Sequence, residues 1–212
     1  MRHLFLPTVA LAKVGLAILL FSSCGQEKTA TPPREVKQYT IEQFYKTKST
    51  GSGVFSPDEQ KLLVHTNESG IFNLYEINIA DGTKKPLTNS TTESYFAIDY
   101  VPASGEVLYA ADKGGNEIDH IYLLKADGTS QDLTPGEKEK AGFSEWANDK
   151  KSFFYTSNKR DERFFDLYRM EVGAWKSSLV FENKDGYGVA AVSRHGDWLA
   201  LGKPITTSEN QL

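Results

Sequence analysis

Residues 54–66 read VFSPDEQKLLVHT, and this stretch is compatible with two different structures. The order Ser56-Pro57-Asp58-Glu59 is that of a helix start, with a serine cap, a proline at the first helical position and a glutamate placed to complete a capping box. The residues on either side, Val54-Phe55 and Leu62-Leu63-Val64, are types that strands favour. The segment is therefore either a helix N-terminus or the turn between two strands.

An internal repeat of about 46 residues decides between the two. Counterparts of Phe55 recur at steps of 45, 46 and 46 residues, and each of the four positions has an apolar residue seven places later. The four pairs are Phe55 and Leu62, Tyr100 and Val107, Trp146 and Phe153, and Val192 and Leu199. The counterparts of Ser56–Glu59 keep turn-forming residues but no capping box, so the segment is predicted to be the turn of a hairpin.

Two further sets of residues repeat in the same register through the first three units. They are Leu74-Tyr75, Ile121-Tyr122 and Leu167-Tyr168, and then Leu87-Thr88, Leu133-Thr134 and Leu179-Val180. Between them stand Asp81-Gly82-Thr83 and Asp127-Gly128-Thr129, which have the Asp-Gly pair of tight hairpins, whereas the third unit has Val172-Gly173-Ala174. The first unit thus divides into strands at about 52–56, 61–66, 72–78 and 84–88.

Four short strands in each unit of this length are typical of a β-propeller blade. A β-sandwich would explain the strands but not the register of the repeat. We therefore predict an all-β fold, a β-propeller with blades of the WD40-like or TolB-like kind. The partial propeller is expected over 51–212, after a short helical lead-in at 39–50. The expected blades are 51–90, 95–136, 142–183 and an incomplete 187–212.

The fourth unit supplies about half a blade, so about three and a half blades are expected and the ring is incomplete. An open stack of blades exposes strand edges, which folded proteins avoid. The sequence is therefore interpreted as the N-terminal part of a longer protein. The alternative is a small stand-alone protein that completes its sheet by pairing with another chain.

The first 23 residues resemble an export signal. A basic start precedes the uncharged run Val14–Phe21, which is too short for a permanent membrane span, and small residues come after it. The only cysteine, Cys24, directly follows Ser22-Ser23, which resembles the bacterial lipoprotein signal, in which the cysteine is lipidated; Phe21 departs from that pattern. A plain signal peptide is the alternative. We predict a signal at 1–23 and a lipidated tether at 24–38.

The remaining composition narrows the class of function. The formal charge of −4 argues against a nucleic-acid partner. If Cys24 is lipidated, acyl chains hold the protein at a membrane. The resemblance to lipoproteins, with Gly25 after the cysteine, implies an exported protein of the bacterial cell envelope, an outer-membrane lipoprotein facing the periplasm.

Two stretches carry a family resemblance over about 39–212. YTIEQFYKTKSTGSGVFSPDEQKLL at 39–63 and FFYTSNKRDERFFDLYRM at 153–170 resemble the propeller of bacterial S9 peptidases, the prolyl oligopeptidase and acylaminoacyl-peptidase-like family. In that family an N-terminal propeller covers an α/β-hydrolase domain with a Ser-Asp-His triad. The G-x-S-x-G motif that carries such a serine is absent from the sequence, and Gly51-Ser52-Gly53 has the wrong spacing. No catalytic residue, cofactor or metal site is therefore assigned.

The most charged cluster of the chain is a weak candidate for substrate binding. It consists of Arg160, Asp161, Glu162 and Arg163, in the loop between the second and third strands of the third unit. In dipeptidyl-peptidase relatives a pair of acidic propeller residues binds the free amine of the substrate, and arginines pair well with a carboxylate. The alternative, which we favour, is a solvated loop whose charges face water and each other.

The histidines and the repeated tyrosines are expected to have structural roles. His65, His120 and His195 lie on separate units without other ligands at metal-binding spacing, so they are interpreted as surface or strand-end residues. Tyr75, Tyr122 and Tyr168 occupy one repeated position and are interpreted as blade packing.

Two functions are compatible with these features. In the first, the chain is the substrate-gating propeller of a serine peptidase that cleaves oligopeptides, inactive alone because it lacks the triad. In the second, it is a non-enzymatic lipoprotein that binds a protein partner, since related repeats also occur in TolB-like periplasmic propellers.

Overall fold

The computed structural model describes residues 35–206 and 209–211, so the predicted signal, Cys24 and most of the tether lie outside the described residues. The described residues fall into two units, which divide after Ile41. Residues 35–40 have no regular structure, and α1 (Ile41–Tyr45) is shorter than the predicted lead-in segment. No helix among the described residues is long and apolar enough to cross a membrane.

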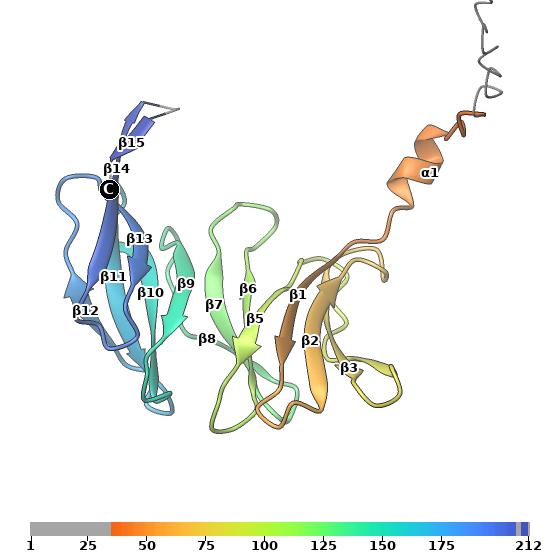
Figure 1. The fold of residues 1–212 in the computed structure, drawn as a ribbon, viewed down its shortest axis with the longest axis horizontal. Helices are drawn as coiled ribbons and strands as arrows, with labels where there is room; N and C mark the ends of the chain where they lie inside the picture. The colour runs from red at the N-terminus through yellow and green to blue at the C-terminus, as the bar shows by residue number, and fades with distance from the viewer. Residues whose placement is uncertain (1–34, 207–208, 212) are drawn as a thin grey trace, which may run out of the picture. The chain divides into compact units, whose positions relative to one another are not determined.

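Four antiparallel sheets succeed one another in chain order (Figure 1). The first contains β1 (Thr50–Phe55), β2 (Lys61–Thr66), β3 (Asn73–Asn78) and β4 (Lys84–Pro86). The second contains β5 (Phe96–Tyr100), β6 (Val107–Ala111), β7 (His120–Leu124) and β8 (Ser130–Asp132). The third contains β9 (Ala141–Trp146), β10 (Ser152–Asp161), β11 (Phe164–Glu171) and β12 (Ser177–Phe181). The fourth contains β13 (Gly188–Val192), β14 (Leu199–Thr206) and β15 (Glu209–Gln211).

Within each sheet the strands pair in the order in which they occur along the chain, which is the topology of a propeller blade. Over the described residues the four sheets form an open, unclosed propeller, as the repeat predicts.

The stretch VFSPDEQKLLVHT forms the first hairpin of the first blade, so the strand-turn interpretation is confirmed. The backbone N–H of Ser56 donates to the carbonyl of Lys61 at 2.9 Å, and the N–H of Lys61 donates to Ser56 Oγ at 2.9 Å. Ser56 Oγ itself donates to a carboxylate oxygen of Asp58 at 2.6 Å. Glu59 lies in the left-handed region, with φ of 57°. The serine therefore closes a turn and caps no helix.

The seven-residue spacing of the repeat is the cross-strand register of the first two strands of every blade. The paired residues are Phe55 and Leu62, Tyr100 and Val107, Trp146 and Phe153, and Val192 and Leu199. The first strand of each blade also carries one unpaired extra residue, a β-bulge, at a repeated position. The four bulge residues are Gly53, Ile98, Ser144 and Ala190.

The core lies between neighbouring blades. One apolar cluster, which includes Leu63 and Tyr109, joins the first two blades, and a second, around Ile121 and Phe153, joins the next two. A third cluster, around Phe154, contacts the fourth blade. Burying such apolar side chains is the main stabilising term, about 1.5–3 kcal/mol for each large one.

At one repeated position, the polar atom of an aromatic side chain makes a hydrogen bond to the preceding blade. Tyr100 Oη donates to Glu76 Oε1 in the preceding blade at 3.0 Å, and Trp146 Nε1 donates to Asp99 Oδ2 in its preceding blade at 2.9 Å. Burial raises the pKa of both Tyr100 and Asp99. Each aromatic residue thus buries its ring and satisfies its polar atom across the interface.

A buried polar residue stands in the third strand of each of the first three blades, one place before the repeated Leu or Ile. It bonds to the end of the fourth strand or to the segment that follows that strand. These linker-binding residues are Asn73, His120 and Asp166, with exposed fractions of 0%, 6% and 0%. The repeated Leu-Thr pairs have a related role, because Thr88 Oγ1 accepts from the N–H of Leu74 and Thr134 Oγ1 from that of Ile121, both at 2.9 Å.

His65 joins the first two blades by a hydrogen bond that depends on its protonation. Its Nδ1 accepts from the backbone N–H of Ala97 at 3.1 Å, and its ring packs edge-on against Phe72 and Phe96. Burial lowers the pKa of His65 from its ordinary value of 6.5. A proton on Nδ1 would abolish this bond, so the neutral ring is the form that fits the interface.

We expect the free energy of unfolding to fall as the pH drops below the ordinary histidine pKa of 6.5. A folded-state pKa below the unfolded one means that the unfolded chain binds the proton more readily, so stability from His65 is full at higher pH and is lost in acid. Urea unfolding at a series of pH values measures the effect. His65→Asn keeps an acceptor in place of Nδ1 but does not titrate, so its profile should be flatter; identical profiles would contradict the prediction.

Candidate functional site

The charged cluster of the sequence analysis lies on the hairpin between β10 and β11. Asp161 pairs with Phe164 across the two strands, so Glu162 and Arg163 form the tip. Because strands alternate in direction, this hairpin lies at the opposite end of the sheets from the turn at Ser56. The structure places the four cluster residues in two distinct roles.

Arg160 is part of the structural framework. Its guanidinium donates to the buried Asp166 in a bidentate pair, Nε to Oδ2 at 2.6 Å and Nη2 to Oδ1 at 2.9 Å, and also to the carbonyl of Asn183 at 2.7 Å. Burial would raise the pKa of Asp166, but hydrogen bonds from Arg160, the N–H of Asn183 and Tyr168 outweigh it and lower that pKa. The ionised carboxylate is therefore fully engaged, and Arg160 has little freedom to meet a ligand.

The other three cluster residues lie at the end of the hairpin, where Glu162 and Arg163 are exposed and Asp161 is partly buried. Asp161 accepts two hydrogen bonds from the guanidinium of Arg163, at 3.0 and 2.7 Å, which hold the pKa of Asp161 well below its usual range. Glu162 pairs with Lys138 at 3.1 Å, with exposed fractions of 67% and 72%. Exposed ion pairs of this kind contribute little to stability, so a ligand can compete for their charges.

An apolar cavity lies beside this hairpin. It has a volume of about 550 Å³, and the side chains of Phe164, Phe165 and Val189 form much of its lining, with Arg163 also lining it. Tyr187 and the buried Asn183 complete one side. We call this space the hairpin cavity. Its combination of aromatic surface and a nearby guanidinium suits a peptide side chain next to a carboxylate.

The linker-binding network fixes the wall of the hairpin cavity. Asn183 accepts from the N–H of Tyr187 at 3.1 Å and donates to the carbonyls of Phe165 and Tyr187. Its own N–H donates to Asp166 Oδ1 at 2.8 Å. Sequence reasoning missed Asp166 and Asn183; the only available signal was a polar residue before each repeated Leu or Ile.

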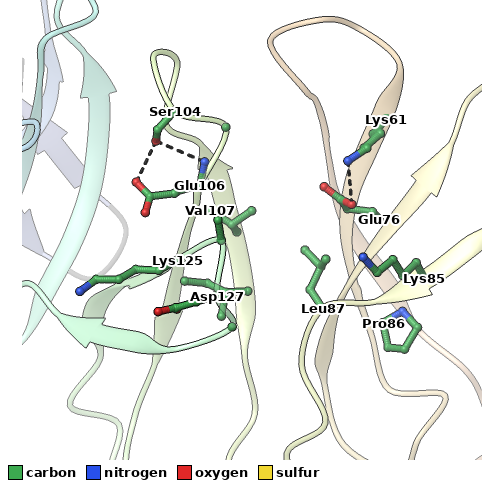
Figure 2. Close-up of a pocket in the computed structure, with 14 residues that line it drawn as sticks. Lys61, Glu76, Lys85, Pro86, Leu87, Ser104, Glu106, Val107, Lys125 and Asp127 are labelled. Atoms are coloured by element: carbon green, nitrogen blue, oxygen red, sulfur yellow. Dashed lines mark hydrogen bonds and ion pairs between the residues drawn. The ribbon is translucent and has the colours of Figure 1, made fainter.

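A second cavity, of about 400 Å³, lies at the other end of the sheets between the first two blades. In Figure 2, Glu76 and Lys85 point towards the gap, whereas Lys125 points away from it. Glu76 is already engaged by Lys61 at 3.2 Å and by Tyr100, so Lys85 is the remaining charged group on that wall. A single free ammonium defines no specific ligand.

The repeated tyrosines pack within the blades, as predicted. Tyr75 and Tyr168 are buried, and Tyr122 stacks on Tyr109 with ring centroids 5.2 Å apart. Of the histidines, His195 is exposed, whereas His65 is partly buried and His120 is buried. His120 stands at the start of β7, as the strand-end interpretation predicts, and it pairs there with Asp132 at 2.7 Å. Among the described residues no group of three or more His, Cys, Asp or Glu residues could hold a metal ion.

A family model described as the N-terminal β-propeller domain of prolyl oligopeptidase matches residues 88–212, more than half of the chain. No curated protein matches the sequence.

Solved propellers share the fold. TolB from Acinetobacter baumannii is 18% identical with a TM-score of 0.56, over 77% of this chain and 40% of TolB. One of two structurally analysed prolyl endopeptidases is 17% identical with a TM-score of 0.57, over 78% of this chain and 28% of the enzyme. Dipeptidyl peptidase 4 from Porphyromonas gingivalis is 13% identical with a TM-score of 0.54, over 79% of this chain and 24% of the peptidase. The chain thus spans less than half the length of each of these proteins.

The division of the cluster predicts unequal effects of mutation. Asp166→Ala leaves the Arg160 guanidinium and the N–H of Asn183 without their partner, and we expect it to lower the free energy of unfolding by about 3 kcal/mol. Asp161→Ala removes only a pair with the exposed Arg163 and should change stability much less. Denaturant unfolding of both variants measures the difference. Equal effects of the two substitutions would refute the assignment of Arg160 to the framework.

Proposed function

The chain belongs to the family of prolyl oligopeptidase N-terminal β-propeller domains, and on that premise we propose that it is the substrate-gating part of a serine peptidase that cleaves oligopeptides. The observation that carries the proposal is the match to the family's propeller over residues 88–212, together with the absence of a G-x-S-x-G motif from the sequence. A separate α/β-hydrolase domain supplies the Ser-Asp-His triad for acyl transfer.

The propeller acts by restricting access. A rigid stack of blades in front of an active site admits an extended oligopeptide and excludes a folded protein. The hairpin cavity gives such a peptide a first contact, with an apolar side chain on Phe164 and Phe165 and its carboxylate beside Arg163. Asp161 and Glu162 offer carboxylates to an amine, whereas Arg160 takes no part because Asp166 engages it.

The purified chain is expected to show no peptidase activity. It is assayed with peptide p-nitroanilides, and the expected rate is that of buffer alone because no activated nucleophile is present. Chain treated with a serine-reactive phosphonate is the control. Turnover that co-purifies with the chain and is abolished by the phosphonate would contradict the proposal.

The second candidate function is a non-enzymatic propeller that binds a protein partner, and the similarity in fold to TolB favours it. The two functions predict different codons after residue 212 in the gene. In-frame codons for further blades and a G-x-S-x-G motif support the peptidase. A stop codon with no hydrolase domain encoded in the same reading frame supports the binding protein.

We further propose that the protein is exported and held at the bacterial outer membrane, facing the periplasm, by lipid on Cys24. The support is the uncharged run Val14–Phe21 and the small residues before the only cysteine.

Cys24→Ser removes the attachment point, so the variant should move from the membrane fraction to the soluble fraction, as judged by immunoblot of fractionated cells. Ser23→Ala, which keeps a small residue before Cys24, is the matched control and should stay in the membrane fraction. Unchanged fractionation of Cys24→Ser would refute the lipid anchor.

A further inference from the structure

His120 differs from the two other linker-binding residues in how much of its polar capacity is used. Asn73 makes four hydrogen bonds, two through Nδ2 to Ser69 and Ser90 and two through Oδ1 from Thr88 and Ser90. Asp166 also accepts four, which come from Arg160, Asn183 and Tyr168. His120 has one polar contact, from Nδ1 to Asp132 Oδ2 at 2.7 Å.

The second ring nitrogen of His120 opens onto a cavity. The residue is only 6% exposed, and among the described residues no fully buried side-chain nitrogen or oxygen lacks a partner. Nε2 has no hydrogen-bond partner in the described part of the chain, so it must reach the cavity of about 400 Å³ that His120 lines. We call this space the His120 cavity. Its volume falls in the range of small-molecule sites.

The partner of His120 fixes the orientation of its ring. An ionised carboxylate only accepts hydrogen bonds, so Nδ1 carries the hydrogen that points to Asp132. Tyr122 stacks on the ring at 20° between planes. The other oxygen of Asp132 accepts from the N–H of Thr134 at 3.0 Å, so this carboxylate is occupied. The ring is thus held with Nε2 as the atom left to meet a ligand.

Two further groups that line the His120 cavity are hydrogen-bond donors. The amide oxygen of Asn116 accepts from the backbone N–H groups of Lys113 and Ile118, at 3.4 and 3.0 Å, which leaves its NH₂ group free. Lys113, the other donor, is exposed and lines the same cavity. Two carboxylates also line the cavity: Asp132, which His120 and the N–H of Thr134 engage, and Glu137, which is exposed.

We propose that the His120 cavity binds a small organic carboxylate of the size of a dipeptide. The Lys113 ammonium and the Asn116 amide donate to its carboxylate oxygens, and Nε2 of His120 and Glu137 accept from its amine. The titratable groups around the ring are Asp132 and Tyr122 on the strands, and Lys113 and Glu137 on the two adjoining loops. This proposal is independent of the peptidase function, because it concerns a different blade and a different cavity.

The test monitors the ring nitrogens of His120 by NMR in the ¹⁵N-labelled chain. Alanyl-alanine is titrated in, beside alanyl-alanine amide, which lacks the carboxylate. The dipeptide is expected to shift the Nε2 resonance of His120 saturably, and the amide is not. Lys113→Met and His120→Asn should each weaken binding roughly tenfold or more, because each removes a charge-assisted hydrogen bond.

The variants separate ligand binding from structure. His120→Asn keeps a donor for Asp132 in place of Nδ1 and removes only the distal nitrogen, whereas His195→Asn is the control at an exposed histidine. If His120→Asn does not fold, the same titration of Lys113→Met tests the proposal, because Lys113 is exposed and its substitution should not disturb the fold.

Absence of a saturable shift, equal binding of the amide, or unchanged affinity in Lys113→Met would overturn the proposal. Inorganic phosphate that binds as well as the dipeptide would mean an adventitious ion only, and would overturn it too.

Discussion

A sheet of four short strands has two faces and can bury neither by itself, and this constraint determines the rest of the structure. Every blade must find its core against its neighbours, so the apolar clusters lie between blades and not within them. Polar side chains then have to be satisfied across the same interfaces. Tyr100 and Trp146 do this at one repeated position, each bonding to a carboxylate of the preceding blade.

Strand register could be predicted from the sequence because it depends on local spacing. The seven-residue step from Trp146 to Phe153, for example, covers two strand ends and a turn, and the same step recurs in all four units. The roles of the buried polar residues could not be predicted in this way. Asn73 bonds to Ser90, 17 residues away, and nothing in the local pattern of β3 shows that its amide faces inward.

The charged cluster shows the same limit at the candidate site. In the sequence, Arg160 and Arg163 are equivalent members of one basic and acidic run. In the structure, Arg160 lies where the β10–β11 pairing is irregular and bonds to the buried Asp166, while Arg163 lies at the tip of the hairpin. A ligand therefore meets the tip and the apolar cavity beside it, on a wall that Asp166 and Asn183 hold in place. The side chains at this site do not identify the family of the protein. The match to the family model does.

The β-bulges in the first strand of each blade mark positions where the amino-acid sequence can vary. Each bulge residue is left out of the pairing with the second strand, so the two flanking residues still face matched partners. The first strand of each blade thus holds one residue more than its neighbour requires. Ile98 packs against the core between the second and third blades, whereas Gly53, Ser144 and Ala190 are exposed. The exposed bulge positions can therefore change their side chains more freely than the paired residues beside them.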